Sequence, residues 1–283
     1  MFNIDTLKKE ILEGEIIELK GKESGTTSLI LVGVHGNEYC GVEAIKELLP
    51  NLQIDKGRVF IAIGNPKAVE QNTRFLESNL NRMFKEDNHL NTLEKKSYEY
   101  NRAQFLKSFM EKSEVLLDIH ASSTPESRIF AICENNAKDI VQHLPVNLVV
   151  SGFDTVEPGG TDYYMNKIGK IGICVECGYL ADKSSIKIAE KTILSFLGVQ
   201  GHIKYPFPKN NQSKIHMNKI HLTKTNSFVL TKPFKDFEEI KKDDLLGIDG
   251  EEKIFAKNDS IILFARNRNK IGEEAFLLGE ILK

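Results

Sequence analysis

The sequence predicts an α/β protein with a mostly parallel sheet flanked by helices, followed by a smaller all-β domain. Up to about residue 200, short apolar runs alternate with segments of helical periodicity, which is typical of strand–helix–strand units. Beyond that point, short apolar runs are separated by Gly, Asp, Asn and Lys, which is typical of an all-β domain. The 283 residues are enough for one large domain and one smaller one.

The predicted strands of the first domain are rich in Val, Ile and Leu. SLILVGV at 28–34 and RVFIAIG at 58–64 are almost wholly apolar, which favours strands buried on both faces. SEVLLDIH at 113–120 is a strand that ends in polar residues. Further strands are predicted at 15–21, 128–133, 147–152 and 170–178.

Three segments have the apolar spacing of helices. GVEAIKELLP at 41–50 is stopped by its proline, and residues 91–113 and 184–199 carry apolar side chains at helical intervals. The linker between the domains is expected near 200–208, where two prolines and two asparagines lie close together. We therefore divide the chain into a catalytic domain at 1–202 and a β domain at 203–283.

Composition excludes several classes of function. The chain has 38 basic and 40 acidic residues, so its charge gives no reason to expect nucleic acid or an anionic membrane as a partner. No apolar run approaches the ~20 residues that cross a bilayer. Residues 1–16 read as an amphipathic segment without the features of a signal peptide, and four cysteines are too few for a disulfide scaffold. A cytoplasmic location is expected, and a homo-oligomer is compatible with the sequence.

Polar side chains follow three of the predicted strands. His35 and Glu38 lie in the turn GVHGNE, His120 ends the strand at 113–120, and Glu176 lies in CVECG near the end of another strand. Ligands of open α/β sheets bind beyond the carboxyl ends of strands. Two His and one Glu form a three-ligand set for catalytic zinc, and a second Glu can take a proton from water. Asp118 could support a ligand from behind, although strand alternation is expected to turn it away.

The segment NPKAVEQNTRFLESNLNRMF at 65–84 holds Arg74 and Arg82 with Asn81, in a chain that has only seven Arg. One interpretation is a polar loop with solvated Arg side chains. The other is a carboxylate pocket, because the planar guanidinium makes a two-point contact that Lys cannot make.

The motifs HGNE, NP followed by TR and NLNR, DIH and VECG, in that order, resemble the succinylglutamate desuccinylase/aspartoacylase family. The resemblance covers Gly33 to Gly178 by motifs and the β-rich tail by architecture. It implies a zinc amidohydrolase with the zinc-carboxypeptidase fold and one Zn²⁺ per chain. It implies the following roles: His35, Glu38 and His120 as zinc ligands, Glu176 as general base, Arg74 as the residue that polarises the scissile carbonyl, and Asn81 with Arg82 as the α-carboxylate site.

Two segments depart from the family pattern. TDYYMNKIGK at 161–170 has Tyr163 and Tyr164, both candidates for substrate binding, but lacks the Arg that aspartoacylases use for the aspartate side chain. N-acetylaspartate is therefore not the expected substrate. The tail stretch LFARNRNKIGEEAF lacks the family's Tyr and has Arg266 and Arg268. These two side chains could meet an acidic group or be solvated, and we favour the solvated position.

The resulting prediction is a zinc-dependent hydrolase that deacylates an N-acyl amino acid or a similar small amide. A metallocarboxypeptidase acting on short peptides is the first alternative, since an Asn–Arg pair would hold either carboxylate. A non-catalytic ligand-binding protein of the same fold is the second. Cys174 and Cys177 resemble a metal knuckle, but residues three apart in a strand face opposite sides, so two buried thiols are expected instead.

Overall fold

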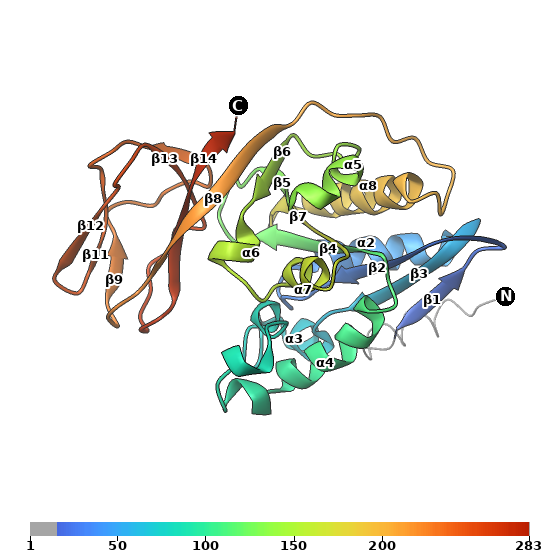
Figure 1. Cartoon of the computed structure of the whole chain (residues 1–283), viewed down its shortest axis with the longest axis horizontal. Coiled ribbons are helices and arrows are strands. Elements are labelled where there is room, and N and C mark those ends of the chain that lie inside the picture. Colours follow the sequence, from blue (N-terminus) through green and yellow to red (C-terminus); the bar gives the residue numbers. More distant parts are fainter. Residues whose placement is uncertain (1–15, 283) are drawn as a thin grey trace.

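The computed structural model describes residues 16–282 and contains one large sheet that runs through the molecule (Figure 1). The predicted amphipathic segment at 1–16 lies almost wholly outside the described residues. The order of strands across the large sheet is β1 (Ile17–Lys20), β3 (Lys56–Ile63), β2 (Glu23–Val32), β4 (Val115–Ser122), β7 (Ile171–Tyr179), β5 (Ile129–Ile132), β6 (Leu148–Ser151), β8 (Ser213–Leu222), β14 (Glu274–Leu282), β13 (Ser260–Leu263) and β10 (Glu238–Ile240).

The centre of this sheet is parallel, as predicted. Strands β3, β2, β4 and β7 are mutually parallel neighbours, and β5 pairs antiparallel with β7. The register places Val32 beside Ile119, Ile119 beside Val175, and His120 beside Glu176. The carboxyl ends of β2, β4 and β7 therefore meet at one edge of the sheet.

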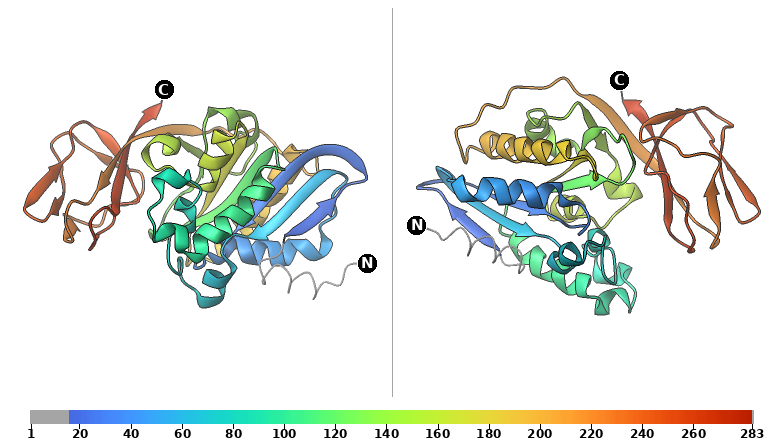
Figure 2. Two further views of the ribbon diagram at one scale, coloured as in Figure 1. Left: turned by 60° about the horizontal axis from the view of Figure 1, so that its bottom comes forward. Right: turned by 180° about the vertical axis from the view of Figure 1, so that it is seen from behind.

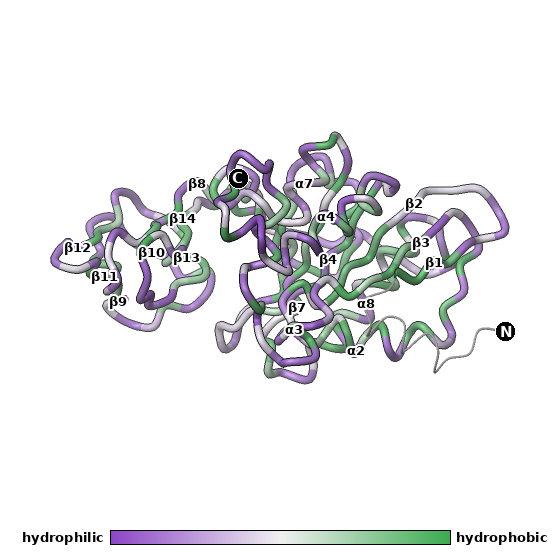
Figure 3. The backbone as a smooth tube through the Cα atoms, turned by 90° about the horizontal axis from the view of Figure 1, so that it is seen from below, coloured by the Kyte–Doolittle hydropathy of each residue, from purple (hydrophilic) through white to green (hydrophobic). Residues whose placement is uncertain are grey.

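Helices cover both faces of the parallel region. On one face, α2 (Tyr39–Leu48) and α8 (Ser184–Val199) lie side by side and share a hydrophobic core with β2, β3, β4 and β7 (Figure 2). On the other face, α4 (Tyr98–Met110) and α7 (Thr161–Lys167) pack on a second core around Leu116. Figure 3 shows the hydrophobic stretches along β2 and β3, as expected for strands covered on both sides. The remaining helical elements are α3 (Pro66–Gln71), α5 (Lys138–Val141), α6 (Phe153–Val156), η1 (Leu49–Asn51), η2 (Leu80–Arg82), η3 (Asp87–His89), η4 (Glu94–Lys96) and η5 (Asn135–Ala137).

The helix predicted at 184–199 has those bounds in the structure, but the helix predicted at 91–113 begins only at Tyr98. The Oγ of Ser97 accepts a hydrogen bond from the backbone N of Tyr100 at 3.1 Å, so Ser97 caps the helix and the residues before it form short turns. Helical periodicity alone did not reveal this cap.

The C-terminal region is all β, as predicted. Its first strand, β8, was not predicted from the sequence. Strand β8 pairs parallel with β6 and antiparallel with β14, so it continues the large sheet into the C-terminal region. A separate small sheet contains β12 (Glu252–Phe255), β11 (Leu245–Asp249) and β9 (Phe228–Leu230). The proposed division at 202/203 stays a prediction. Within residues 16–282, no helix is both long and apolar enough to span a bilayer.

Candidate active site

The turn that carries His35 and Glu38 follows β2 directly and is held against the loop after β3. Gly36 lies so close to α3 that an added Cβ would be 2.1 Å from the carbonyl carbon of Ala68. The backbone N of Gly36 also donates a hydrogen bond to the carbonyl oxygen of Arg74 at 3.2 Å. The glycine of HGNE is thus required by close backbone approach, and it ties the two segments that carry the motifs together.

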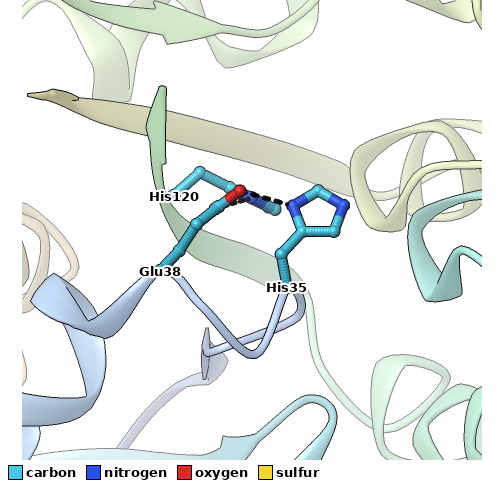
Figure 4. A group of neighbouring side chains, drawn as sticks. All are labelled: His35, Glu38 and His120. Carbon is cyan, nitrogen blue, oxygen red and sulfur yellow. Dashed lines mark hydrogen bonds and ion pairs between the residues drawn. The ribbon is translucent and has the colours of Figure 1, made fainter. Parts of the chain in front are cut away.

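His35, Glu38 and His120 converge at the carboxyl ends of β2 and β4 (Figure 4). The Nδ1 of His35 lies 2.8 Å from Oε1 of Glu38, and the Nδ1 of His120 lies 3.0 Å from Oε2 of the same carboxylate. All three side chains are buried. Neighbouring histidines lower the pKa of Glu38 well below its usual value although burial alone would raise it, so the carboxylate is ionised.

Asn79 determines which nitrogen of His35 faces this cluster. The Oδ1 of Asn79 accepts a hydrogen bond from the backbone N of Asn81 at 3.0 Å and lies 3.1 Å from Nε2 of His35. Because that oxygen can only accept, Nε2 carries the hydrogen and Nδ1 presents its lone pair to Glu38. Burial, and then the charge of Arg74, lowers the pKa of His35 to about 4, which keeps the ring neutral.

Asp118 determines which nitrogen of His120 faces the cluster, as Asn79 does for His35. The expectation that Asp118 turns away from His120 is therefore corrected. The two residues are separated by one position in β4, so their side chains lie on the same face of the sheet. The Oδ2 of Asp118 lies 2.9 Å from Nε2 of His120 and accepts a hydrogen bond from Oγ1 of Thr161 at 2.7 Å. A carboxylate behind a metal-binding imidazole orients the ring and raises its basicity.

The donor set fits a divalent metal ion. Two imidazole nitrogens and a carboxylate oxygen face one another, and the three ligand atoms all lie within 4.8 Å of each other. The buried Nδ1 of His35 makes no hydrogen bond of acceptable geometry with any described residue, which is uncommon for a buried polar atom. These residues would hold a cation, which would accept that lone pair and compensate the buried carboxylate.

Glu176 lies beside this cluster because β7 is in register with β4. Its side chain is buried, and its Oε2 has no hydrogen-bond partner among the described residues. Burial and the nearby charge of Glu38 raise the pKa of Glu176 to about 8. A carboxyl group in such surroundings is suited to accept and return a proton near neutral pH.

Arg74 comes from the loop after α3, and Nη1 of its guanidinium donates a hydrogen bond to Oε1 of Glu38 at 3.0 Å. The loop is held by Glu99, a fully buried residue of α4 that the sequence analysis did not single out. Its carboxylate accepts hydrogen bonds from the backbone N of Leu76 at 2.8 Å and of Ser78 at 3.1 Å. One buried side chain of α4 therefore shapes the loop that carries the motif residues.

Asn81 and Arg82 both line the pocket next to the cluster, and both lie in the short turn η2. The Oδ1 of Asn81 accepts a hydrogen bond from the backbone N of Thr161 at 3.2 Å. The guanidinium of Arg82 is paired with two acidic side chains of the chain itself, Glu157 and Glu274. Substrate binding by Asn81 and Arg82 stays a prediction.

The two tyrosines differ in position. Tyr163 lines the pocket, and its hydroxyl donates a hydrogen bond to Glu86 at 3.1 Å. Tyr164 does not line it: its ring packs on the core around Leu116, and its hydroxyl donates to Glu111 at 2.8 Å. The structure therefore brings Tyr163 but not Tyr164 to the pocket, because consecutive residues of α7 point to different sides.

The C-terminal region forms one wall of the pocket. Arg266 and Arg268 both lie in this wall, which corrects the expectation that they are solvated. The other residues that the region contributes are Phe264, Glu274, Phe276 and Leu277. No local sequence pattern indicates this position, because the pairing of β14 with β8 and β13 brings distant segments to the site.

Comparison with known proteins agrees with this arrangement. Residues 24–199 match the model of the succinylglutamate desuccinylase/aspartoacylase catalytic domain. The chain belongs to this family. The match begins in β2 and ends with α8, so it contains every motif that carries the cluster.

Individual relatives are distant in sequence. Succinylglutamate desuccinylase of Vibrio vulnificus is 23% identical over 290 residues, covering 93% of this chain and 83% of that protein. A probable aspartoacylase of Prochlorococcus marinus is 28% identical over 272 residues, covering 82% and 85%. The solved succinylglutamate desuccinylase of Vibrio cholerae superposes with a TM-score of 0.81 at 17% identity, covering 94% of this chain and 85% of that one. The similarity to this solved structure confirms the fold over the 94% of the chain that it covers.

Proposed function

We propose that this family member is a zinc-dependent amidohydrolase that removes the acyl group from an N-acyl amino acid or a similar small carboxylate-bearing amide. The observation that carries the proposal is the convergence of His35, Glu38 and His120 beside Glu176. One Zn²⁺ per chain, held by the first three residues, would polarise the substrate and lower the pKa of a water molecule.

The chain's own residues account for the remaining steps. The carboxylate of Glu176 takes a proton from the attacking water and returns it to the leaving amine nitrogen. The guanidinium of Arg74 donates hydrogen bonds to the carbonyl oxygen of the scissile amide, where negative charge develops. Asp118 and Asn79 hold the two imidazoles in the required tautomers.

The shape of the pocket favours a small substrate over a peptide. Phe264, Arg266 and Phe276 of the C-terminal region close one side of the pocket next to the catalytic groups. A metallocarboxypeptidase needs room for several residues on the acyl side of the scissile bond. The non-catalytic alternative is disfavoured because the metal-binding set and the base are all present. The four cysteines are free, which fits a reducing cytoplasm.

A substrate screen tests this proposal. The zinc-loaded protein is incubated with a panel of N-acetyl amino acids, N-succinyl amino acids and short peptides, and the Glu176→Gln variant serves as the control for contaminating hydrolases. We expect the wild-type protein to hydrolyse N-acyl amino acids and the Glu176→Gln variant not to do so. Hydrolysis restricted to peptides would favour the carboxypeptidase, and bound zinc without any hydrolysis would favour the ligand-binding protein.

A further inference from the structure

Arg82 has almost no hydrogen-bonding capacity left for a substrate. Its Nε donates to Oε1 of Glu274 at 2.8 Å, and its Nη2 donates to Oε2 of the same carboxylate at 2.9 Å. Nη2 also pairs with Glu157, and Nη1 donates to the carbonyl oxygen of Asn81 at 2.7 Å. The guanidinium has five N–H groups in all, so only an Nη1 hydrogen remains, and Arg82 cannot make a two-point contact with another carboxylate while it keeps these partners.

The charge of Arg82 is also compensated. Burial opposes ionisation of Glu274, but Arg82 holds the pKa of that carboxyl well below its usual value. Burial and a hydrogen bond to Glu274 raise the pKa of Glu157 to about 8, although Arg82 acts in the opposite direction. At neutral pH the group therefore contains one cation, one carboxylate and one protonated carboxyl, with no net charge to attract an anion.

Displacing Glu274 to free Arg82 would be costly. Only 16% of the Arg82 side chain is exposed to solvent, and 34% of the Glu274 side chain is exposed. Removing a partner from a buried ion pair leaves an uncompensated charge in a medium of low dielectric constant. A substrate carboxylate would have to replace all of the contacts that Glu274 makes.

Arg266 differs from Arg82 in this respect. It follows β13, and its backbone N donates to the carbonyl oxygen of Ala275 at 2.8 Å, which places it beside Glu274. Its side chain lines the same pocket as Glu176, yet its guanidinium makes no hydrogen bond or ion pair with any residue of the described range 16–282. Arg268, by comparison, uses its Nε to donate to the carbonyl oxygen of Glu274 at 2.7 Å.

The surroundings of Arg266 favour an anionic ligand. Burial, and then the positive charges of Arg74 and Arg268, lowers the pKa of Arg266, with Asp236 and Glu176 acting in the opposite direction. Guanidinium groups that repel one another in a partly buried pocket are stabilised by a carboxylate placed among them. An unpartnered fork is also able to make the two-point contact that Arg82 cannot make.

We propose that Arg266, and not Arg82, binds the carboxylate of the substrate in this protein, and that Glu274 holds Arg82 in the pocket wall as a structural residue. The proposal rests on the proposed function, which supplies the class of substrate. The carboxylate can belong to the amino acid or, in a succinyl substrate, to the acyl group. Both sources share the same chemistry, and the experiment separates them.

The test compares Arg266→Gln with the matched control Arg128→Gln. Arg128 is exposed outside the pocket, with its guanidinium over the ring of Phe237, so the control removes one positive charge from the same molecule. Each protein is assayed on an N-acetyl amino acid and its α-carboxamide, and on an N-succinyl and an N-butyryl amino acid. In each pair a carboxylate is replaced by a neutral group.

We expect the wild-type protein and Arg128→Gln to prefer the carboxylate in at least one pair. Arg266→Gln is expected to lose roughly 10- to 100-fold of that preference in kcat/KM, as for a charge-assisted hydrogen-bonded pair. The pair in which the loss occurs identifies the source of the carboxylate. Unchanged preferences in Arg266→Gln would overturn the proposal. A second result would also overturn it: a loss of the carboxylate preference in Arg82→Lys and not in Arg266→Gln. Lys keeps a positive charge next to Glu274, so such a loss would show that the guanidinium of Arg82 contacts the substrate.

A binding measurement makes the inference independent of catalysis. The metal-free protein is titrated with an N-acetyl amino acid, an N-succinyl amino acid and their neutral counterparts, and thermal unfolding is followed. Stabilisation by the carboxylate form is expected in the wild-type protein and in Arg128→Gln, and not in Arg266→Gln. Equal stabilisation in all three proteins, or none in the wild-type protein, would count against Arg266. If the zinc-loaded protein hydrolyses no substrate, the proposed function is wrong. The binding measurement still tests whether Arg266 binds a carboxylate, because it does not depend on turnover.

Discussion

The Nε2 of His120 lies 2.9 Å from the carboxylate of Asp118, two residues earlier in the same strand, while its Nδ1 points to Glu38. The strand therefore supplies both a proposed metal ligand and the group that orients it. Burial disfavours a charged ring, but Asp118 raises the pKa of His120 well above its usual value in the metal-free protein. A carboxylate next to Nε2 makes Nδ1 a better electron donor when a cation is bound.

Replacing Asp118 by Asn is expected to weaken metal binding about 10- to 100-fold, because the amide cannot stabilise the ring hydrogen in the same way. Competition between the protein and a chelator measures the affinity. Asp139→Asn is the matched control, since Asp139 is exposed on α5. Equal affinities in the two variants would show that Asp118 does not support the metal site.

His35→Ala is expected to abolish metal binding altogether, because it removes one of only three protein donors. Metal analysis of the purified variant after dialysis provides the measurement. Full zinc occupancy in this variant would mean that the ion is bound elsewhere.

Glu176→Gln is expected to retain the metal and the affinity for substrate and to lose turnover by ~100-fold or more. The amide preserves the shape of the side chain but cannot accept a proton from water. Steady-state kinetics together with zinc analysis checks both halves of the prediction. A variant with nearly native turnover would place the general base at another residue.

The parts of the site that the sequence could predict are those carried by short motifs at strand ends. His35, Glu38, His120 and Glu176 meet because each follows a strand of the parallel region or lies near its carboxyl end, and parallel strands end at one edge. Asp118 was within reach of the same reasoning, since a separation of two residues in a strand places side chains on one face. The expectation that Asp118 turns away from His120 was therefore wrong, because strand alternation itself places the two side chains on one face.

The remainder depended on contacts between distant segments. Arg82 and Glu274 are 192 residues apart in the chain, and no local pattern connects them. The solvated position expected for Arg266 and Arg268 was wrong for the same reason: the pairing of β8 with β14, which brings their segment to the pocket, involves a strand that the sequence did not reveal. Glu99 likewise carries no motif, and only its burial identifies it as the organiser of the Arg74 loop.

Arg74→Ala is expected to lower kcat with a smaller effect on KM. Arg74 is assigned to charge that develops on the carbonyl oxygen in the transition state, and removing such a donor costs roughly 100- to 1,000-fold in turnover. Steady-state kinetics on the best substrate of the panel gives both constants. An increase in KM with unchanged kcat would instead make Arg74 a residue of ground-state binding.

The pairing of Glu157 with Glu274 and Arg82 makes a prediction about stability. Burial, opposed by Arg82 and assisted by Glu274, raises the pKa of Glu157 from 4.5 to about 8, so the native protein keeps a proton that the unfolded chain loses above pH 4.5. The free energy of unfolding that this group contributes is therefore fully present below pH 4.5 and is lost as pH rises to 8. Glu157→Gln mimics the protonated carboxyl and removes this dependence.

The difference in unfolding free energy between Glu157→Gln and the wild-type protein is thus expected to rise with pH between 4.5 and 8. The limiting slope is about 1.4 kcal/mol per pH unit in favour of the variant. The lowered pKa of Glu274 acts in the opposite sense, with stability lost as pH falls below its usual value, but both proteins share it and it cancels. Urea unfolding at pH 5, 6 and 7, with chelator present so that metal binding does not contribute, measures the difference. Parallel pH profiles would show that Glu157 is ionised in the native state, and that Arg82 is then held by two negative charges instead of one.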